Sequence, residues 1–236
     1  MTPDEVVASE SETITVAIGV YAEMQHELDL FMDGVAKWFL KHPQMSKGIP
    51  PLVHSVTSRM KDPEHLREKL ERKFTENGVL TFAPQDLGTH VTDLAGVRVL
   101  HLHETQFAQI HTLFMTKIES GDWTLAEKPK AYTWDPESRA FFEALGLECS
   151  VKESFYTSVH YVVRPKPNGK LACEIQVRTL FEEVWEEVDH SLKYPNKTVT
   201  LSCKEQLRVL SKLVGAGSRL VDSIYRTNQV ESIDLK

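Results

Sequence analysis

The chain has 236 residues, of which 41% are hydrophobic and 26% charged, a composition typical of a soluble globular protein with one large domain or two small ones. Its formal net charge of −7 gives no overall attraction to nucleic acid or anionic lipid, so any polyanion site must be a local basic patch. No apolar run approaches the roughly 20 residues of a membrane helix, the acidic N-terminus is unlike a signal peptide, and three widely spaced cysteines fit neither a disulfide framework nor a zinc site, so we expect a reducing, cytoplasmic location with no membrane partner.

Helical patterns dominate the N-terminal part of the sequence. Apolar residues recur at helical spacing over residues 13–41, which predicts one long amphipathic helix. After a break rich in proline, we expect a short second helix over residues 52–60. Asp62 and Pro63 then supply an N-cap and a first-turn proline for a third helix, which Asn77-Gly78 stops.

Strand and helix patterns alternate in the rest of the chain. The two strongest β runs, residues 159–163 and 171–177, are joined by a segment with hairpin chemistry. The further predicted elements are strands at residues 94–102 and 123–126, and helices at residues 104–118, 135–146, 180–188 and 201–228. This pattern predicts an α+β protein in which a mixed, mainly antiparallel β-sheet is flanked by helices, with helical arms at both ends.

The first group of residues that could carry chemistry is basic. His65, Lys69 and Lys73 are four residues apart on the third helix, so they share one face with Arg59 and Lys61 at its entry. Cations that converge on a helix N-terminus suit a polyphosphate, because free backbone N–H groups and the helix dipole add to their charge. A solvated helix face laced with glutamates is the alternative interpretation.

The second group is Asp93-Leu-Ala-Gly-Val-Arg98, which leads into a strand. A carboxylate in this place could hold Mg²⁺, while Arg98 takes a phosphate or stacks on a base. An ordinary turn with a surface ion pair is the alternative.

The third group is Glu174-Ile-Gln-Val-Arg178 on the second hairpin strand. Period two puts Glu174, Gln176 and Arg178 on one face, with the apolar Ile175 and Val177 on the other. A polar face on so β-prone a run needs either a ligand or water next to it, and a solvated sheet face is the alternative.

The fourth group is Tyr156-Thr-Ser-Val-His160, which enters the first hairpin strand. The same alternation points Tyr156, Ser158 and His160 in one direction, where they could stack a base and bond a sugar. A buried structural histidine is the alternative. Because the two strands pair as a hairpin, we expect all four groups to meet over one sheet face.

The order of these motifs resembles that of the RelA/SpoT-type alarmone synthetase domain. The order is Arg-x-Lys with a basic helix, then Asp-x-x-Gly-x-Arg, Tyr-x-Ser-x-His, and Glu-x-Gln-x-Arg-Thr before a Trp-containing acidic helix. The resemblance spans about residues 53–194 and implies the nucleotidyltransferase-like synthetase fold of a short member without a hydrolase domain. It divides the chain into an N-terminal helical arm over residues 1–50, a pyrophosphokinase domain over residues 51–195 and a C-terminal helix over residues 196–236.

The resemblance implies an ATP-dependent transfer of the β,γ-pyrophosphate to the ribose 3′-hydroxyl of GDP or GTP, which makes the alarmone (p)ppGpp. The two arginines would sandwich the adenine and the other cations would hold the phosphates, with His65 where the family commonly has a serine. The implied ATP-binding residues are Arg59, Lys61, His65, Lys69, Lys73 and Arg98. Asp93 would bind Mg²⁺, and Glu174 would activate the 3′-hydroxyl or share the metal.

The acceptor side departs further from the family pattern. Tyr156 would stack the acceptor base, and the rest of this side would be shaped by Ser158, His160, Gln176 and Arg178. Phe155 stands where guanine-nucleotide synthetases commonly have Asn-Gly, and the basic element that often precedes it is missing. GDP or GTP is our first choice of acceptor. The 3′ end of tRNA, as in toxin members of the family, or an adenine nucleotide is the alternative.

A catalytically inactive nucleotide-binding member is the remaining hypothesis, and the presence of Asp93 and Glu174 argues against it. Two protein partners stay open at this point. They are a second copy of the chain, which would associate through the terminal helices, and an antitoxin protein.

Overall fold

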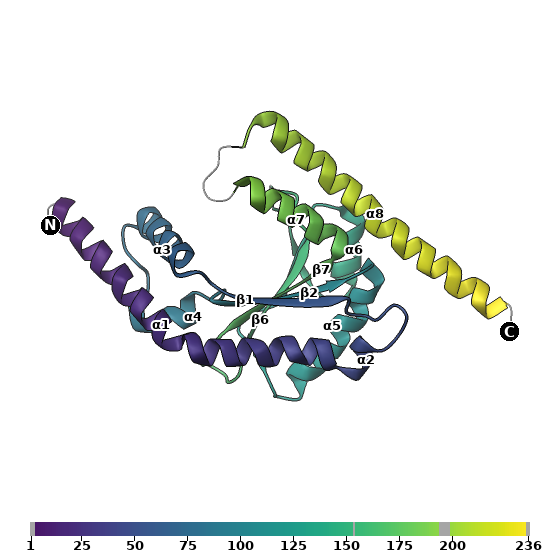
Figure 1. Ribbon diagram of the computed structural model, residues 1–236, viewed down its shortest axis with the longest axis horizontal. Coiled ribbons are helices and arrows are strands. Elements are labelled where there is room, and N and C mark those ends of the chain that lie inside the picture. The colour runs from purple at the N-terminus through teal and green to yellow at the C-terminus, as the bar shows by residue number, and fades with distance from the viewer. Residues whose placement is uncertain (1–2, 153, 194–198, 235–236) are drawn as a thin grey trace.

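A seven-stranded mixed β-sheet lies at the centre of the computed structural model, which describes residues 3–152, 154–193 and 199–234 (Figure 1). The strands are β1 (Ser55–Met60), β2 (Ala95–His101), β3 (Thr124–Leu125), β4 (Lys130–Tyr132), β5 (Glu148–Ser150), β6 (Ser158–Arg164) and β7 (Cys173–Thr179). Their order is β1-β2-β7-β6-β4-β5, and β3 pairs with β6. Among the described strands, β2–β7 and β4–β5 pair in parallel and the other pairs are antiparallel. The predicted α+β class with a mixed, mainly antiparallel sheet is therefore confirmed.

Helices cover both faces of this sheet. Figure 1 shows α1 and α5 on one side and α3 and α7 on the other, with α8 running along the outside of α7. The helices are α1 (Pro3–Lys41), α2 (Pro43–Ser46), α3 (Pro63–Asn77), α4 (Leu87–His90), α5 (Glu104–Glu119), α6 (Pro136–Ala144), α7 (Leu180–Lys193) and α8 (Leu201–Asp234), with a 3-10 turn, η1 (Pro84–Asp86). The long helices predicted from apolar periodicity are all present, and the first and last are longer than predicted.

The helix α1 supplies much of the core on its side of the sheet. Its residues Tyr21, Leu28, Val35 and Phe39 are at most 1% exposed. The Phe39 ring stacks on that of Phe114 from α5, with 5.7 Å between the ring centroids. The apolar stripe that predicts the helix is thus the surface that packs on the sheet, as the amphipathic pattern requires.

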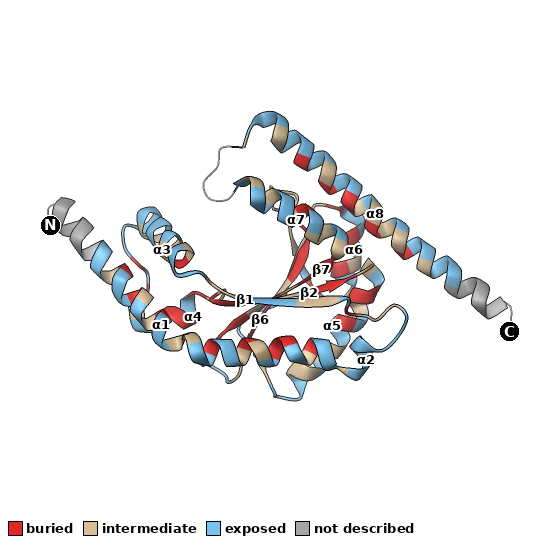
Figure 2. Cartoon of the chain, viewed as in Figure 1, coloured by how far each residue is buried: buried red, intermediate tan, exposed pale blue. Residues whose placement is uncertain are grey.

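The hairpin β6–β7 has the predicted alternation. Ile175 and Val177 are at most 2% exposed and face the core, while Glu174 and Gln176 are partly exposed on the other side (Figure 2). The antiparallel register places His160 opposite Gln176. The period-two interpretation is confirmed for Glu174 to Val177, whereas Arg178, which was expected on the same open face, is buried.

The prediction of a short second helix over residues 52–60 is wrong. Residues 55–60 form the edge strand β1, which pairs antiparallel with β2 from Ser55↔Leu100 to Met60↔Ala95. The β-branched Val56 and Thr57 favour this outcome, but neither face of the strand is consistently apolar, so the sequence offers no alternation to detect. The short strands β4 and β5 were likewise not predicted, because three residues are too few to define a period.

Buried polar contacts fasten α8 to the body of the protein. The Asp222 carboxylate accepts from the Thr105 backbone N–H at 3.0 Å and lies 2.6 Å from His103 Nδ1, at the N-terminus of α5. Arg219 pairs with Asp135, which caps α6. Asp222 of α8 accepts a hydrogen bond at the N-terminus of α5, and Arg219 of α8 binds the N-cap residue of α6. These two contacts fix α8 against α5 and α6.

None of the helices in the described ranges has a segment long and apolar enough to cross a membrane. The division into residues 1–50, 51–195 and 196–236 stays a prediction, and its second boundary lies outside the described residues.

A buried glutamate at the N-terminus of α7, Glu182, should make the stability of the protein depend on pH. Glu182 accepts from the Thr179 backbone N–H at 2.7 Å, and burial, with the nearby Glu104 carboxylate, raises the pKa of Glu182 to about 7. Because the raised pKa exceeds that of the unfolded chain, the stability that this group contributes at low pH is lost as the pH rises from about 4.5 through 7. Glu182→Gln should therefore gain melting temperature relative to wild type between pH 5 and pH 8, by about 2–4 °C for each kcal/mol recovered.

Thermal unfolding monitored by circular dichroism measures this difference. Glu76→Gln, on the exposed side of α3, is the matched control and should follow the wild-type pH profile. A Glu182→Gln melting temperature that keeps the same offset from wild type at both pH values would contradict the assignment.

Candidate active site

The strand register brings residues of three of the predicted groups together. In the β1–β2–β7 part of the sheet, Arg59 lies beside Gly96, and Gly96 lies beside Glu174. Two residues further along both strands, Arg98 lies beside Gln176. Side chains in register on neighbouring strands point to the same face, so the arginines, the carboxylate and the amide share one surface.

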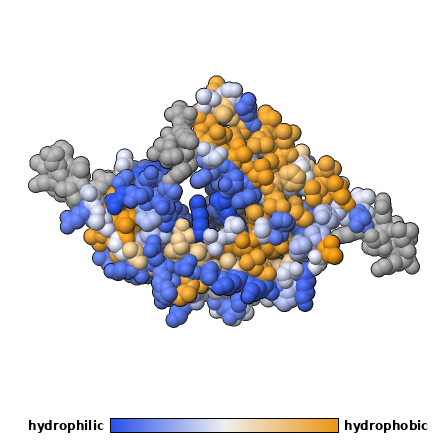
Figure 3. Space-filling model, viewed as in Figure 1, coloured by the Kyte–Doolittle hydropathy of each residue, from blue (hydrophilic) through white to orange (hydrophobic). Residues whose placement is uncertain are grey.

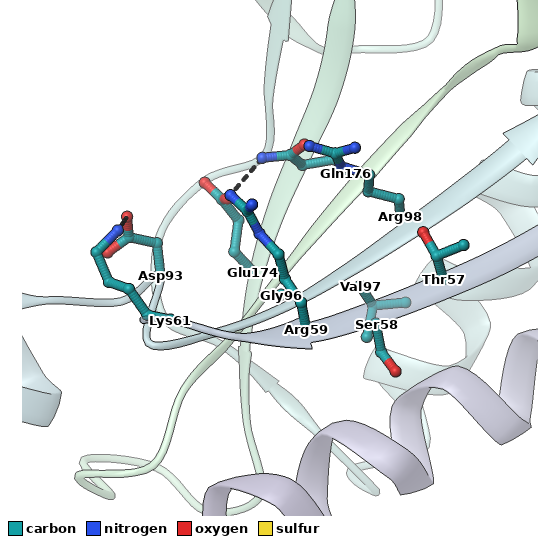
Figure 4. A pocket seen from close by; sticks show the side chains of 10 residues that line it. All are labelled: Thr57, Ser58, Arg59, Lys61, Asp93, Gly96, Val97, Arg98, Glu174 and Gln176. Carbon is teal, nitrogen blue, oxygen red and sulfur yellow. Dashed lines mark hydrogen bonds and ion pairs between the residues drawn. The ribbon is translucent and has the colours of Figure 1, made fainter. Parts of the chain in front are cut away.

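This surface forms a cavity of about 280 Å³ (Figure 4). Six of the predicted site residues line it together with four that were not predicted: Thr57, Ser58, Arg59, Lys61, Asp93, Gly96, Val97, Arg98, Glu174 and Gln176. Figure 3 shows hydrophilic residues gathered around the hollow between the α3 and α7 sides of the molecule. The expectation that all four groups meet over one sheet face is confirmed for three of them. No residue of the fourth group lines the cavity, although His160 contacts Glu174.

Asp93 sits between two lysines at one end of the cavity. Lys61 Nζ lies 3.0 Å from one carboxylate oxygen and Lys69 Nζ lies 2.7 Å from the other. Burial alone would raise the pKa of Asp93, but the two ammonium groups outweigh it and hold the pKa below its usual value. Two cations against one carboxylate leave a local positive excess, which suits a polyphosphate.

The helix α3 holds Lys69 in place. Asp62 caps the helix by accepting from the backbone N–H groups of Glu64 and His65, as the sequence predicts. Four-residue spacing puts His65 and Lys73 on the same side of α3 as Lys69, although none of the three lines the cavity. The basic helix therefore lies beside the cavity, and Lys69 links it to the cavity through its ion pair with Asp93.

Glu174 lies in the middle of the surface and is held as a carboxylate. Its Oε1 lies 3.3 Å from His160 Nδ1, and Gln176 Nε2 donates to its Oε2 at 2.7 Å. Burial would raise the pKa of Glu174, but His160 and Gln176 lower it overall. Ionised Glu174 can accept a proton or bind a cation.

Arg98 is held from the other side by α7. Its Nη1 lies 3.1 Å from Glu183 and 2.6 Å from Glu187. The second oxygen of Glu183 lies 2.6 Å from Nε of Arg178, whose side chain is fully buried. Glu183 thus joins an arginine of the cavity to one in the interior, and the neighbouring Glu186 comes within 3.8 Å of Arg178.

The sequence analysis noted that α7 is acidic but did not predict that its glutamates pair with Arg98 and Arg178. Glu183 and Glu187 are one helical turn apart and follow Arg178 closely, so an (i, i+4) carboxylate pair beside a strand arginine was the available signal.

Tyr156 and Ser158 lie deeper than expected. The strand β6 begins only at Ser158, so Tyr156 precedes it and is 6% exposed, with its hydroxyl 2.9 Å from His160 Nε2. Ser158 Oγ donates to the Val177 carbonyl at 3.3 Å. The Lys152 ammonium lies 4.5 Å from the centroid of the Tyr156 ring and 4.0 Å from that of Tyr132. The acceptor-side residues of the prediction are therefore close together, but the Tyr156 ring is covered.

Because Arg178 is buried, we expect substitutions of Glu183 and Glu187 to change the free energy of unfolding by different amounts. Glu183→Gln removes the charge that faces the fully buried Arg178, and we expect it to lower the free energy of unfolding by about 3 kcal/mol. Glu187 is 59% exposed, so Glu187→Gln is the matched control and should change the free energy by at most about 0.5 kcal/mol. Urea denaturation of both variants gives the comparison, and equal losses would refute the bridging role of Glu183.

Comparison with solved structures finds the same fold in small alarmone synthetases. The small alarmone synthetase 1 from Bacillus subtilis, bound to its product pppGpp, is 21% identical with a TM-score of 0.59, over 88% of this chain and 93% of that chain. The same protein bound to AMPCPP is 21% identical with a TM-score of 0.55, over 89% and 94%. A GTP pyrophosphokinase family protein from Streptococcus pneumoniae is 20% identical with a TM-score of 0.59, over 92% and 95%.

Comparison of sequences gives the family. No curated protein sequence matches the chain. The family model described as the region found in RelA / SpoT proteins matches residues 58–199, which is more than half of the chain and includes every predicted site residue. The chain belongs to the RelA/SpoT family.

Proposed function

We propose that this protein is a pyrophosphokinase that transfers the β,γ-pyrophosphate of ATP to the ribose 3′-hydroxyl of GDP or GTP. The observation that carries the proposal is that Asp93 and Glu174 line one cavity with three cationic side chains, while a fourth cation, Lys69, pairs with Asp93. Family membership and the fold of the small alarmone synthetases support a synthetase-like pyrophosphotransferase. The choice of ATP as the donor and of GDP or GTP as the acceptor rests on the resemblance to the family.

The donor triphosphate would bind at the Asp93 end of the cavity. Lys61 and Lys69 are already close together there, and the phosphate oxygens would compete with Asp93 for their ammonium groups. Arg59 and Arg98 reach the same cavity from β1 and β2 (Figure 4), and planar guanidinium groups suit the two faces of a purine base. His65 and Lys73 extend the positive face of α3 beyond the cavity.

The carboxylates fit a Mg²⁺ ion that binds together with the substrate. The described residues include no cluster of three or more His, Cys, Asp or Glu side chains that could hold a metal ion. Asp93 and Glu174 line one cavity and each offers oxygen atoms, so Mg²⁺ would complete its coordination with phosphate oxygens and water, as it commonly does. When bound, the ion would neutralise charge on the transferred pyrophosphoryl group.

In this proposal, Glu174 would accept the proton of the acceptor. As the 3′-oxygen attacks the β-phosphorus, the bond from that phosphorus to the oxygen bridging the α- and β-phosphates breaks and AMP leaves. The 3′-hydroxyl proton passes to the Glu174 carboxylate, while Gln176 and His160 hold that carboxylate in position. Lys61 and Lys69 counter the negative charge that develops on the leaving side.

A different acceptor is the second candidate. The covered Tyr156 ring and the Lys152 ammonium over it mark the acceptor side as the part of the site that departs most from the expected arrangement. The 3′ end of tRNA or an adenine nucleotide would keep the same donor chemistry. Incubation with γ-labelled ATP and Mg²⁺ plus GDP, GTP, adenine nucleotides or bulk tRNA identifies the acceptor. Label on GDP or GTP supports the proposal, and label only on another acceptor would replace it.

Asp93 should be essential for transfer. Asp93→Asn removes the proposed metal ligand, and we expect a loss of rate of roughly 100-fold or more in a protein that still folds, because Asp93 lies in a partly exposed turn. Asp33→Asn, which removes the charge of an exposed ion pair on α1, is the matched control. A folded Asp93→Asn protein with near-normal turnover would eliminate the proposed metal site.

Glu174 should matter for the rate and much less for donor binding. Glu174→Gln keeps the shape of the side chain but removes the proton acceptor, so we expect turnover to be lost while affinity for the ATP analogue AMPCPP changes only slightly. Calorimetric titration with AMPCPP measures the affinity. If affinity and turnover fell in parallel, Glu174 would belong to the donor site instead.

A further inference from the structure

A small hydrophobic cluster lies apart from the main core and joins the segment before β6 to the two C-terminal helices. Its buried members are Tyr156 from that segment, Trp185 from α7 and Val214 from α8. The partly buried residues packed against them are Tyr132, Phe155 and Leu210. The cluster thus brings the proposed acceptor side into contact with α8, none of whose described residues lines the cavity.

The backbone at Phe155 has a conformation that a phenylalanine rarely adopts. Its φ is 63°, in the left-handed region that favours glycine. The Phe155 N–H donates to the Lys152 carbonyl at 3.1 Å and closes a turn just before Tyr156. A bulky residue stays in a strained conformation only where its surroundings hold it there, so the contacts of the Phe155 ring indicate what fixes this turn.

The Phe155 ring is attached to α8 directly and through a second aromatic ring. The Arg208 guanidinium on α8 lies 5.0 Å from the centroid of the Phe155 ring, within the range of a cation–π interaction. The Trp134 ring meets that of Phe155 edge to face, with 5.7 Å between the centroids. Trp134 itself packs on α8, since a Cβ atom at Gly215 would lie 3.7 Å from its ring. These contacts anchor the turn to the C-terminal helix.

The residue that follows Phe155 leads to the proposed proton acceptor. The Tyr156 hydroxyl lies 2.9 Å from His160 Nε2, and His160 Nδ1 lies 3.3 Å from Glu174 Oε1. Because the two residues are adjacent, the backbone conformation at Phe155 sets the direction in which the Tyr156 ring leaves the chain. The anchor on α8 is therefore linked to Glu174 through two side chains.

We propose that Phe155 is a positioning residue for the acceptor, which holds Tyr156, and through it His160, in the orientation that the transfer needs. The inference rests on the proposed function and adds α8 as the support of the acceptor side. A glycine at this position would adopt the same φ without strain but would have no ring to place on α8. The phenylalanine gives up backbone freedom and gains an attachment to the helix.

Substitutions of Phe155 separate the ring from the backbone. Phe155→Ala removes the ring and keeps a Cβ in the left-handed turn, whereas Phe155→Gly removes the ring and fits the turn. We expect both to raise the KM for GDP by roughly tenfold and to leave the KM for ATP nearly unchanged. Phe155→Tyr keeps the ring and should retain the wild-type KM values. Initial rates with labelled ATP give these constants, and a wild-type KM for GDP in Phe155→Gly would overturn the proposal.

Arg208 tests the support from α8, because it lies outside the cavity. Its side chain is 51% exposed, and its Nη1 is 3.9 Å from the carboxylate of Glu205. Arg208→Gln removes the cation over the Phe155 ring and should raise the KM for GDP by roughly 2–5-fold. Lys212→Gln, at an exposed position one turn further along α8, is the matched control and should leave that KM unchanged. Equal effects of the two substitutions would overturn the role of α8.

Hydrogen exchange measures the anchor without catalysis. Phe155→Ala and Arg208→Gln should speed amide exchange in a peptide that covers residues 154–157, because loss of the anchor makes local opening easier. Lys212→Gln should not. Unchanged exchange in Phe155→Ala would overturn the anchor. A wild-type protein that transfers no pyrophosphate would contradict the proposed function instead, and the exchange rates would still decide whether the Phe155 ring holds the turn.

Discussion

The parallel pairing of β2 with β7 is the constraint on which the site depends. The two strands are far apart in sequence, yet their register sets Gly96 beside Glu174 and Arg98 beside Gln176. The antiparallel neighbours β1 and β6 then add Arg59 on one side and His160 on the other. Loss of this register by one residue would turn every polar side chain toward the core, because strand side chains alternate.

Electrostatic compensation keeps this surface stable. Asp93 is balanced by Lys61 and Lys69, and Glu174 by His160 and Gln176, so carboxylates that burial would neutralise stay ionised. The acidic residues of α7 likewise keep Arg98 ionised, because they raise its pKa. The oxygen atoms of a substrate rich in phosphate would compete with Asp93 for its lysine partners.

Much of the fold was predictable because the decisive patterns are long or regular. The stripe of α1, the cap of α3 at Asp62 and the alternation of Glu174-Ile-Gln-Val-Arg178 are local signals, and each is present in the structure. The edge strand β1 was predicted as a helix because its identity comes from pairing with β2, which no local pattern reveals.

The candidate site was predictable where its residues share a strand face and less so where they meet through packing. Glu183 reaches Arg98 only because α7 folds back over β2 and β7, a contact between distant segments. The covering of Tyr156 by Lys152 likewise depends on how the segment before β6 packs. Side-chain partners of this kind are set by tertiary structure rather than by spacing.

The proposed transfer cleaves ATP between its α- and β-phosphates. Phosphorus NMR of the full chain with ATP, Mg²⁺ and GDP measures this directly, because each product has its own resonances. We expect AMP to appear in the same amount as a nucleotide that carries a new 3′-diphosphate. Formation of ADP and inorganic phosphate in place of AMP would contradict it.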